Sequence, residues 1–343
     1  MSAAPHSEYR GIPVIDVGSL LDPRRSPDER AIAASEIDRA CREMGFFAIA
    51  GHGVDPLLQC RLDRAARAFF ALPDRTKDEI AMARAGSAWR GWFPVGGELT
   101  SGRPDHKEGI YFGDELPEEH PRVAAGTPLH GRNLFPDTPS DLRPAVLEWL
   151  DAMRRVADAV MRGIAVGLGL PATWFEDDLT GDPTALFRIF HYPPSDHADT
   201  KDDGIWGVGE HTDYGLLTLL AQDDNGGLQV ELLDGTWLDV ELDSSLLVCN
   251  IGDMLERLTD GRYRSTPHRV RNTSGADRLS FPYFFDPSWD ATVPTLPLAR
   301  TFENRSHRRW DGEEVQAWQG TYGDYLTAKV AKVFPSLFTT LRP

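Results

Sequence analysis

Two histidines and an aspartate, in the pattern His211-Thr212-Asp213 followed by His268, constrain this sequence more than any other feature. Residues i and i+2 of a strand point to the same face, so in a strand His211 and Asp213 project together and Thr212 turns away. His268 lies 55 positions after Asp213, a separation that several short strands must span before the sheet returns to the same point. Two imidazoles and one carboxylate cap one face of an octahedral metal and leave three positions open, which is the ligand set of non-haem iron(II) oxygenases.

A second pair of polar residues follows shortly after the last histidine. Arg278 and Ser280 repeat the i, i+2 spacing on either side of Leu279, so in a strand a guanidinium and a hydroxyl face the same way. A guanidinium binds a carboxylate through two charge-assisted hydrogen bonds. The pattern therefore predicts a carboxylate-binding pair close to the metal ligands.

Short apolar runs surround these motifs. Between residues 185 and 285 the chain alternates runs such as 216–220 and 246–249 with turn signals such as Asn225-Gly226-Gly227. Many short, evenly spaced strands predict an antiparallel sandwich or jelly roll.

Helical patterns flank this region on both sides. Ser26, Pro27 and Glu29 form a start signal for a helix that ends near Met44. An apolar stripe along residues 146–164 predicts the longest helix.

Two further segments indicate how the chain is organised. Residues 84–106 are rich in Gly, Arg and aromatics without periodicity, which predicts a covering loop, and residues 311–333 predict a C-terminal helix. We see no repeat and no linker. The sequence predicts one domain, 1–343, with parts as follows: a largely helical N-terminal region 1–183, a jelly-roll catalytic core 184–290 and a C-terminal helical flank 291–343.

Net charge and composition limit the kinds of molecule that the protein is expected to bind. The formal net charge is −17, so neither nucleic acid nor an anionic membrane is attracted to the surface as a whole. No run approaches about 20 apolar residues, and the N-terminus lacks the pattern of a signal peptide. Three dispersed cysteines indicate reduced thiols. We expect a cytoplasmic protein that acts on a small molecule.

Several segments together resemble the isopenicillin N synthase-like branch of the Fe(II)/2-oxoglutarate-dependent dioxygenases. Besides the motifs above, the resemblance rests on segments along nearly the whole chain: Ile12-Pro13-Val14-Ile15-Asp16, Gly45-Phe46-Phe47, Gly51-His52-Gly53-Val54, Phe70-Ala71-Leu72-Pro73, Asn250-Ile251-Gly252-Asp253 and His268-Arg269-Val270. Their order and spacing make it specific. It implies the double-stranded β-helix form of the jelly roll, a mainly β fold with flanking helices.

The resemblance also implies a reaction and its cofactors. Fe(II) is bound by the three ligands, 2-oxoglutarate chelates the iron, and O2 takes the remaining position. The distal carboxylate of 2-oxoglutarate pairs with Arg278 and Ser280, and Tyr192 matches a family position whose hydroxyl helps to hold the oxoacid. The ligands implied for Fe(II) are His211, Asp213 and His268. The implied reaction oxidises a small organic substrate by hydroxylation, desaturation or ring closure and releases succinate and CO2.

Substrate recognition is assigned by the same resemblance. Arg90 or Arg188 would orient a carboxylate or phenol of the substrate. The candidates for the substrate pocket are Arg90, Phe93, Tyr111, Arg188, Phe190 and Phe284.

Three alternative functions and one rival metal site are weighed at the level of sequence. A non-catalytic jelly-roll binding or storage module would not need three well-placed ligands. An oxidase like isopenicillin N synthase itself uses Arg278 and Ser280 to grip its substrate and needs no 2-oxoglutarate. A zinc hydrolase could use the same three ligands with an open position for water, but it has no use for Arg278 and Ser280. The segment Asp105-His106-Lys107-Glu108 holds a rival His-x-carboxylate pair, which lacks a later histidine and Arg-x-Ser.

Overall fold

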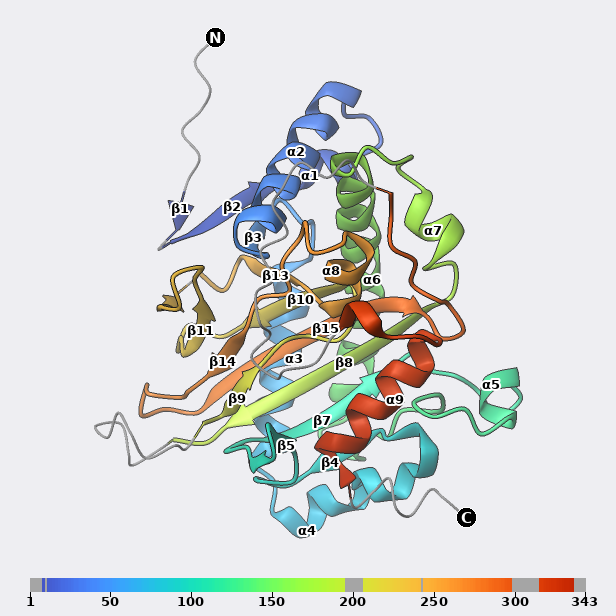
Figure 1. Ribbon diagram of the computed structural model, residues 1–343. Coiled ribbons are helices and arrows are strands. Elements are labelled where there is room, and N and C mark those ends of the chain that lie inside the picture. The colour runs from blue at the N-terminus through green and yellow to red at the C-terminus, as the bar shows by residue number, and fades with distance from the viewer. Residues whose placement is uncertain (1–7, 10, 195–205, 242, 298–314, 336–343) are drawn as a thin grey trace.

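Nine strands form the main sheet of the molecule (Figure 1). The structure is a computed structural model that describes residues 8–9, 11–194, 206–241, 243–297 and 315–335. The order across the main sheet is β1 (Glu8–Tyr9), β2 (Ile12–Asp16), β3 (Phe46–Ala50), β13 (Leu247–Ile251), β10 (Leu217–Gln222), β15 (Arg278–Ser288), β8 (Pro183–Tyr192), β7 (Glu108–Gly113) and β4 (Gly91–Phe93). Strands β2 and β3 are parallel and the other neighbours are antiparallel.

A smaller antiparallel sheet packs against the main one. Its order is β12 (Trp237–Val240), β11 (Leu228–Glu231), β14 (His268–Val270) and β9 (Val208–His211). Residues of β9, β11 and β14 line the same cavity as residues of β8, β10, β13 and β15, so the two sheets face each other across it. This arrangement confirms the predicted jelly-roll core. A short hairpin, β5 (Leu99–Thr100) and β6 (Arg103–Pro104), forms a two-stranded sheet of its own, and β5 contacts β9.

Helices flank the sheets, as predicted. The longest, α6, packs against α2, α3 and the strands β10 and β15 (Figure 1). Ser26 and Glu29 form the predicted capping box of α2. The helices are α1 (Gly18–Leu21), α2 (Pro27–Glu43), α3 (Pro56–Phe70), α4 (Asp74–Lys77), α5 (Pro121–Ala124), α6 (Leu142–Gly167), α7 (Trp174–Asp178), α8 (Asp253–Leu258) and α9 (Tyr322–Val333). Within the described ranges, none combines the length and apolar composition needed to cross a membrane.

Two expectations about local structure were wrong. Residues 84–106 are not a plain loop, because Gly91–Phe93 form the edge strand β4 and Met82–Ala88 form a 3-10 helix. The C-terminal helix begins only at Tyr322, after Gly320, whose φ of 133° is incompatible with helix. The predicted start of that helix, residues 311–314, lies outside the described residues. Helix α9 contacts β15 and β5 and covers one side of the cavity with Leu326.

Candidate functional site

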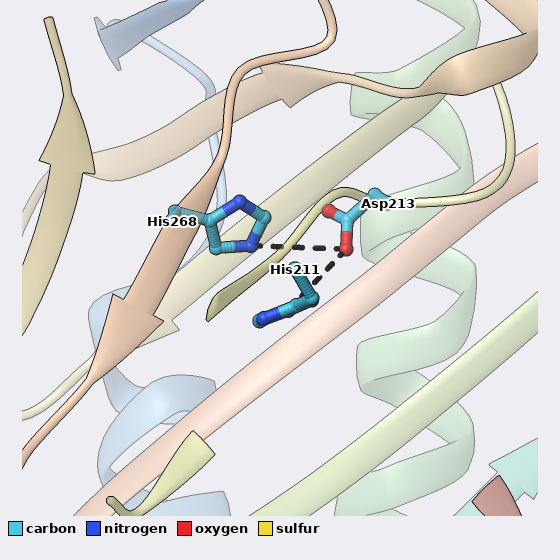
Figure 2. A group of neighbouring side chains, drawn as sticks. All are labelled: His211, Asp213 and His268. Carbon is cyan, nitrogen blue, oxygen red and sulfur yellow. Dashed lines mark ion pairs between the residues drawn. The ribbon is translucent and has the colours of Figure 1, made fainter. Parts of the chain in front are cut away.

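Three side chains with metal-binding atoms meet between the two sheets (Figure 2). His211 ends β9 and His268 begins β14, and the strand register sets them opposite each other. Their Nε2 atoms lie 3.9 Å and 3.8 Å from Oδ1 of Asp213. All three ligand atoms are within 4.8 Å of one another, close enough for a single cation to reach them.

The alternation of a strand does not account for this cluster. Strand β9 ends at His211, so Asp213 reaches the cluster from the turn that follows. Thr212, which was expected to turn away, is buried and lines the same cavity. The local prediction of two residues on one strand face was therefore wrong, although the two residues do meet.

The hydrogen bonds of both histidines set the tautomer of the neutral ring. Nδ1 of His211 lies 2.8 Å from the carbonyl oxygen of Gly209, and Nδ1 of His268 lies 3.2 Å from that of Thr266. A carbonyl can only accept, so Nδ1 carries the proton and the Nε2 lone pair faces Asp213. Burial, followed by the neighbouring His268, lowers the pKa of His211 to about 3. The neutral form is the one that binds a metal.

Asp213 is held as a carboxylate by hydrogen bonds from the main sheet. Its Oδ2 accepts from Thr218 Oγ1 at 2.5 Å and from Asn250 Nδ2 at 2.6 Å. Burial acts to raise the pKa of Asp213, but His268, His211 and these two hydrogen bonds outweigh it and keep the pKa below the usual value. Oδ1 is left to face the imidazoles.

A buried cation that has no counter-ion among the described residues lies in the same cavity. Arg278 is 0% exposed, and its Nε donates to the carbonyl of Gly226 while Nη2 donates to Gln222 Oε1 at 3.0 Å. Nη1 of Arg278 and Nε2 of Gln222 find no partner in the described part of the chain. Burying a charge or a donor unpaired costs energy, so these groups mark a place that an anionic acceptor completes.

Two hydroxyls stand next to this cation. Arg278 pairs in register with Tyr192, and its guanidinium lies 4.7 Å from the centre of the tyrosine ring. The Tyr192 hydroxyl is 3.3 Å from Ser280 Oγ. A Cβ on Gly207 would lie 2.6 Å from Cδ1 of the Tyr192 ring, so this glycine makes room for the tyrosine.

Comparisons with known proteins match this geometry. The model of the 2OG-Fe(II) oxygenase superfamily matches residues 183–287, and that of the non-haem dioxygenase in morphine synthesis N-terminal region matches residues 12–138. A probable iron/ascorbate oxidoreductase of Dictyostelium discoideum is 44% identical over 95% of this chain and 95% of its own length. This chain belongs to the 2OG-Fe(II) oxygenase superfamily.

Two further relatives of this dioxygenase carry more specific descriptions. A homoarginine-6-hydroxylase of Oryza sativa subsp. japonica is 35% identical over 96% of this chain and 99% of its own. A full-length Neurospora crassa protein, crystallised in complex with alpha-KG and thymine, has a TM-score of 0.75 and 26% identity, over 95% of this chain and 98% of its own. The predicted reaction class is confirmed: the protein is an Fe(II)- and 2-oxoglutarate-dependent dioxygenase that uses O2. A zinc hydrolase is not supported.

The residues of the dioxygenase cavity fit both cofactors. Two neutral imidazoles and one carboxylate suit Fe(II). The unpartnered Nη1 of Arg278, with Ser280 and Tyr192 beside it, suits the distal carboxylate of 2-oxoglutarate. The cavity has a volume of about 950 Å³, open solvent at its mouth included, which leaves space for a small organic substrate as well.

The structure brings only some of the predicted substrate residues to the cavity. Arg188, Phe190 and Phe284 line it. Tyr111 and Phe93 lie one layer behind: Tyr111 stacks on Arg188 at 4.2 Å, and Phe93 packs edge-on against Tyr111 at 5.4 Å.

Arg90 lies away from the cavity altogether. Its Nη2 donates to the carbonyl of Leu129 at 2.7 Å, and its guanidinium fills the space beside Gly113, where a Cβ would lie 2.2 Å from it. The prediction that Arg90 orients substrate therefore has no support in its position. The rival metal pair around His106 is not formed either, because Asp105 pairs with Lys107 and Glu108 with Lys77.

Several residues of the cavity were not found from the sequence. Asn250 and Lys107 were noticed only as parts of sequence motifs, and nothing marked Glu98, Thr218 or Leu326 of α9. Gln222, which bonds to Arg278, was not found either.

Asn250→Ala is expected to weaken metal binding by about 10- to 100-fold, because the carboxylate of Asp213 loses one of the two donors that orient it. Equilibrium dialysis against Fe(II) under anaerobic conditions measures the effect. Asn133→Ala is the matched control, since this buried amide bonds to the backbone of Gly113 outside the cavity. Equal metal affinity of the Asn250 variant and the wild type would contradict the role given to this hydrogen bond.

Proposed function

We propose that this dioxygenase oxidises a small organic substrate at the cavity between its two sheets, with the following division of roles. His211, Asp213 and His268 bind Fe(II). Arg278, Ser280 and Tyr192 bind 2-oxoglutarate. The residues proposed to contact the organic substrate are Arg188, Phe190 and Phe284.

One observation carries this proposal: the His-Asp-His cluster lies in the same cavity as the buried Arg278, whose Nη1 has no hydrogen-bond partner among the described residues. The cluster alone would suit several metals. The arginine adds a site for an anion, and 2-oxoglutarate has a metal-binding end and a distal carboxylate to satisfy both.

The chain's own groups prepare the reaction. When bound, iron and 2-oxoglutarate activate O2 for oxidation of the substrate as the oxoacid is converted to succinate and CO2. Thr218 and Asn250 hold Asp213 ionised, and the carbonyls of Gly209 and Thr266 place the proton of each neutral imidazole on Nδ1, so that Nε2 is the nitrogen available to a metal. The apolar walls exclude water, which strengthens the polar contacts inside.

Two further proposals concern the protein as a whole. The N-terminal strands β2, β3, β4 and β7 share one sheet with the core strands β13 and β8, which supports a single oxygenase domain. The three cysteines are free, which supports a cytoplasmic location.

The named relatives leave two substrate chemistries to consider. Homoarginine, named for the rice relative, carries a guanidinium cation. Thymine, named in the Neurospora crassa complex, is an uncharged ring with two carbonyl groups. Both are small molecules of the kind proposed for this cavity.

Anaerobic addition of Fe(II) and 2-oxoglutarate is expected to produce a metal-to-ligand charge-transfer band, because the oxoacid chelates the metal. Admission of O2 in the presence of substrate is then expected to release succinate. His268→Ala is the control that should show neither signal. Oxygen uptake that proceeds without any oxoacid would overturn the assignment of Arg278 and favour an enzyme like isopenicillin N synthase.

A further inference from the structure

We propose that the organic substrate presents an sp2 oxygen, from a carboxylate or a ring carbonyl, to Arg188 and carries no cationic side chain. The inference rests on the proposed function, since it concerns the substrate of the same cavity. The observations that support it are the hydrogen bonds and ion pairs of the charged groups that line the cavity.

Arg188 is a cation whose hydrogen-bonding capacity is left open. It lies on β8 opposite Tyr111 of β7, and its guanidinium sits 4.2 Å from the Tyr111 ring and 4.7 Å from the Phe284 ring. Its buried Nε has no hydrogen-bond partner within the described residues. Nη1 is 3.7 Å from Glu98 Oε1, which is beyond hydrogen-bond distance.

Glu98 already interacts with one hydroxyl group and two cations. It is 4% exposed, its Oε1 accepts from the Tyr111 hydroxyl, and its Oε2 lies 2.9 Å from Lys107 Nζ. Burial acts to raise the pKa of Glu98, but the charges of Lys107 and Arg188 outweigh it and lower the pKa. Glu98 is therefore an ionised group whose charge is shared by two cations, although its Oε2 accepts no hydrogen bond among the described residues.

The remaining carboxylates of the cavity are occupied as well. Among the described residues that line it, these are Asp213, in the metal cluster, and Asp286. Asp286 accepts from the Tyr322 hydroxyl of α9, and a Cβ on Gly215 would lie 1.4 Å from its Oδ1. The carboxyl group of Asp286 is thus enclosed by the turn after Asp213 and by α9.

These contacts determine which substrate charge the cavity accepts. A substrate cation would face Arg188 and Lys107, and like charges repel strongly in a water-poor site. Glu98, the carboxylate next to them in the described lining, already shares its charge with both. An sp2 oxygen would instead satisfy the open donors of Arg188. Phe190, Tyr214 and Phe284 provide surface for a flat apolar body.

The test compares two classes of small molecule for binding to the anaerobic enzyme loaded with Fe(II) and 2-oxoglutarate. Phenylacetate and indole-3-acetate represent carboxylates, thymine and uracil represent ring carbonyls, and L-homoarginine and L-arginine represent cations. Calorimetry and the change in the charge-transfer band report binding. We expect at least one acceptor probe to bind about 10-fold or more tightly than either cation, and the better acceptor class identifies the source of the oxygen.

Variants then connect this preference to Arg188. Arg188→Met is expected to weaken the best acceptor probe by about 10- to 100-fold, the range of one or two charge-assisted hydrogen bonds. Arg188→Lys keeps the charge, and it should retain more affinity for a carboxylate than for a ring carbonyl. The matched control is Arg154→Met, because Arg154 stacks on Phe285 at 5.4 Å and does not line the cavity. Its buried Nε also has no hydrogen-bond partner in the described chain and lies 3.5 Å from a carboxylate, that of Asp158.

The outcomes separate this inference from the function on which it rests. Tighter binding of a cation, no binding of any acceptor probe, or unchanged affinity in Arg188→Met overturns the inference. In each case an intact charge-transfer band with Fe(II) and 2-oxoglutarate leaves the proposed function standing. Loss of that band in the wild type would instead remove the proposed function.

Discussion

His268→Ala is expected to reduce Fe(II) affinity by more than about 100-fold while the protein stays folded, since removal of a ligand exceeds the effect of removing a hydrogen bond to one. The imidazole contributes little else: Nδ1 contacts the Thr266 carbonyl, and the ring packs edge-on against Phe46 at 5.2 Å. His211→Ala and Asp213→Ala should behave in the same way. Iron content after anaerobic reconstitution and circular dichroism of each variant provide the measurement.

His130→Ala is the control for this experiment. His130 also directs Nδ1 to a backbone carbonyl, that of Pro128 at 2.8 Å, and packs edge-on against an aromatic ring, Trp289 at 5.0 Å. It belongs to no metal-binding group among the described residues, so its loss should leave iron binding unchanged. Full iron occupancy in the His268 variant would falsify the ligand assignment.

Arg278→Leu is expected to weaken 2-oxoglutarate binding by about 2–5 kcal/mol, because the distal carboxylate loses its buried counter-charge. Iron binding should remain, since Arg278 is not part of the metal cluster. The protein without cofactors should be as stable as the wild type or more stable, because leucine removes a buried cation that has no counter-ion among the described residues. Anaerobic titration with 2-oxoglutarate and thermal unfolding measure the two effects.

A variant of a second buried arginine is the control that distinguishes the loss of a buried charge from the loss of the binding site. Arg90 is 2% exposed and donates to the Leu129 carbonyl outside the cavity. Arg90→Leu should therefore remove a buried charge and leave the affinity for 2-oxoglutarate unchanged. If instead Arg278→Leu bound 2-oxoglutarate as tightly as the wild type, the oxoacid would have to be held elsewhere.

Motifs with local spacing were predicted most reliably from the sequence. Ser26 and Glu29 correctly predicted the start of α2. Arg278 and Ser280 lie on one strand, β15, as expected. His211, Asp213 and His268 were selected together, and the structure brings them together. Such patterns can be recognised in a sequence because they depend on the repeat of a helix or strand and on the chemistry of the ligands themselves.

Predictions that depended on which side chains face each other or the cavity in the folded chain were less successful. Arg90 and Arg188 looked equally suitable as substrate cations, yet Arg90 is enclosed beside Gly113 and Arg188 faces the cavity. Asp213 was assigned to a strand, although it reaches the cluster from a turn. Gln222 attracted no notice, because its importance lies in a bond to Arg278, 56 positions away.

The sequence by itself determined the family, the jelly-roll class and the identity of the metal and carboxylate motifs. The tertiary structure alone decided which hydrogen-bond donors in the cavity remain unpaired. Tyr111 and Glu98 reach Arg188 from segments distant in sequence, and Lys107 reaches Glu98, so the outcome depends on pairing register and on burial that no local pattern records. A buried donor becomes a binding site only when its neighbours leave it without an acceptor, and that is a property of the folded chain.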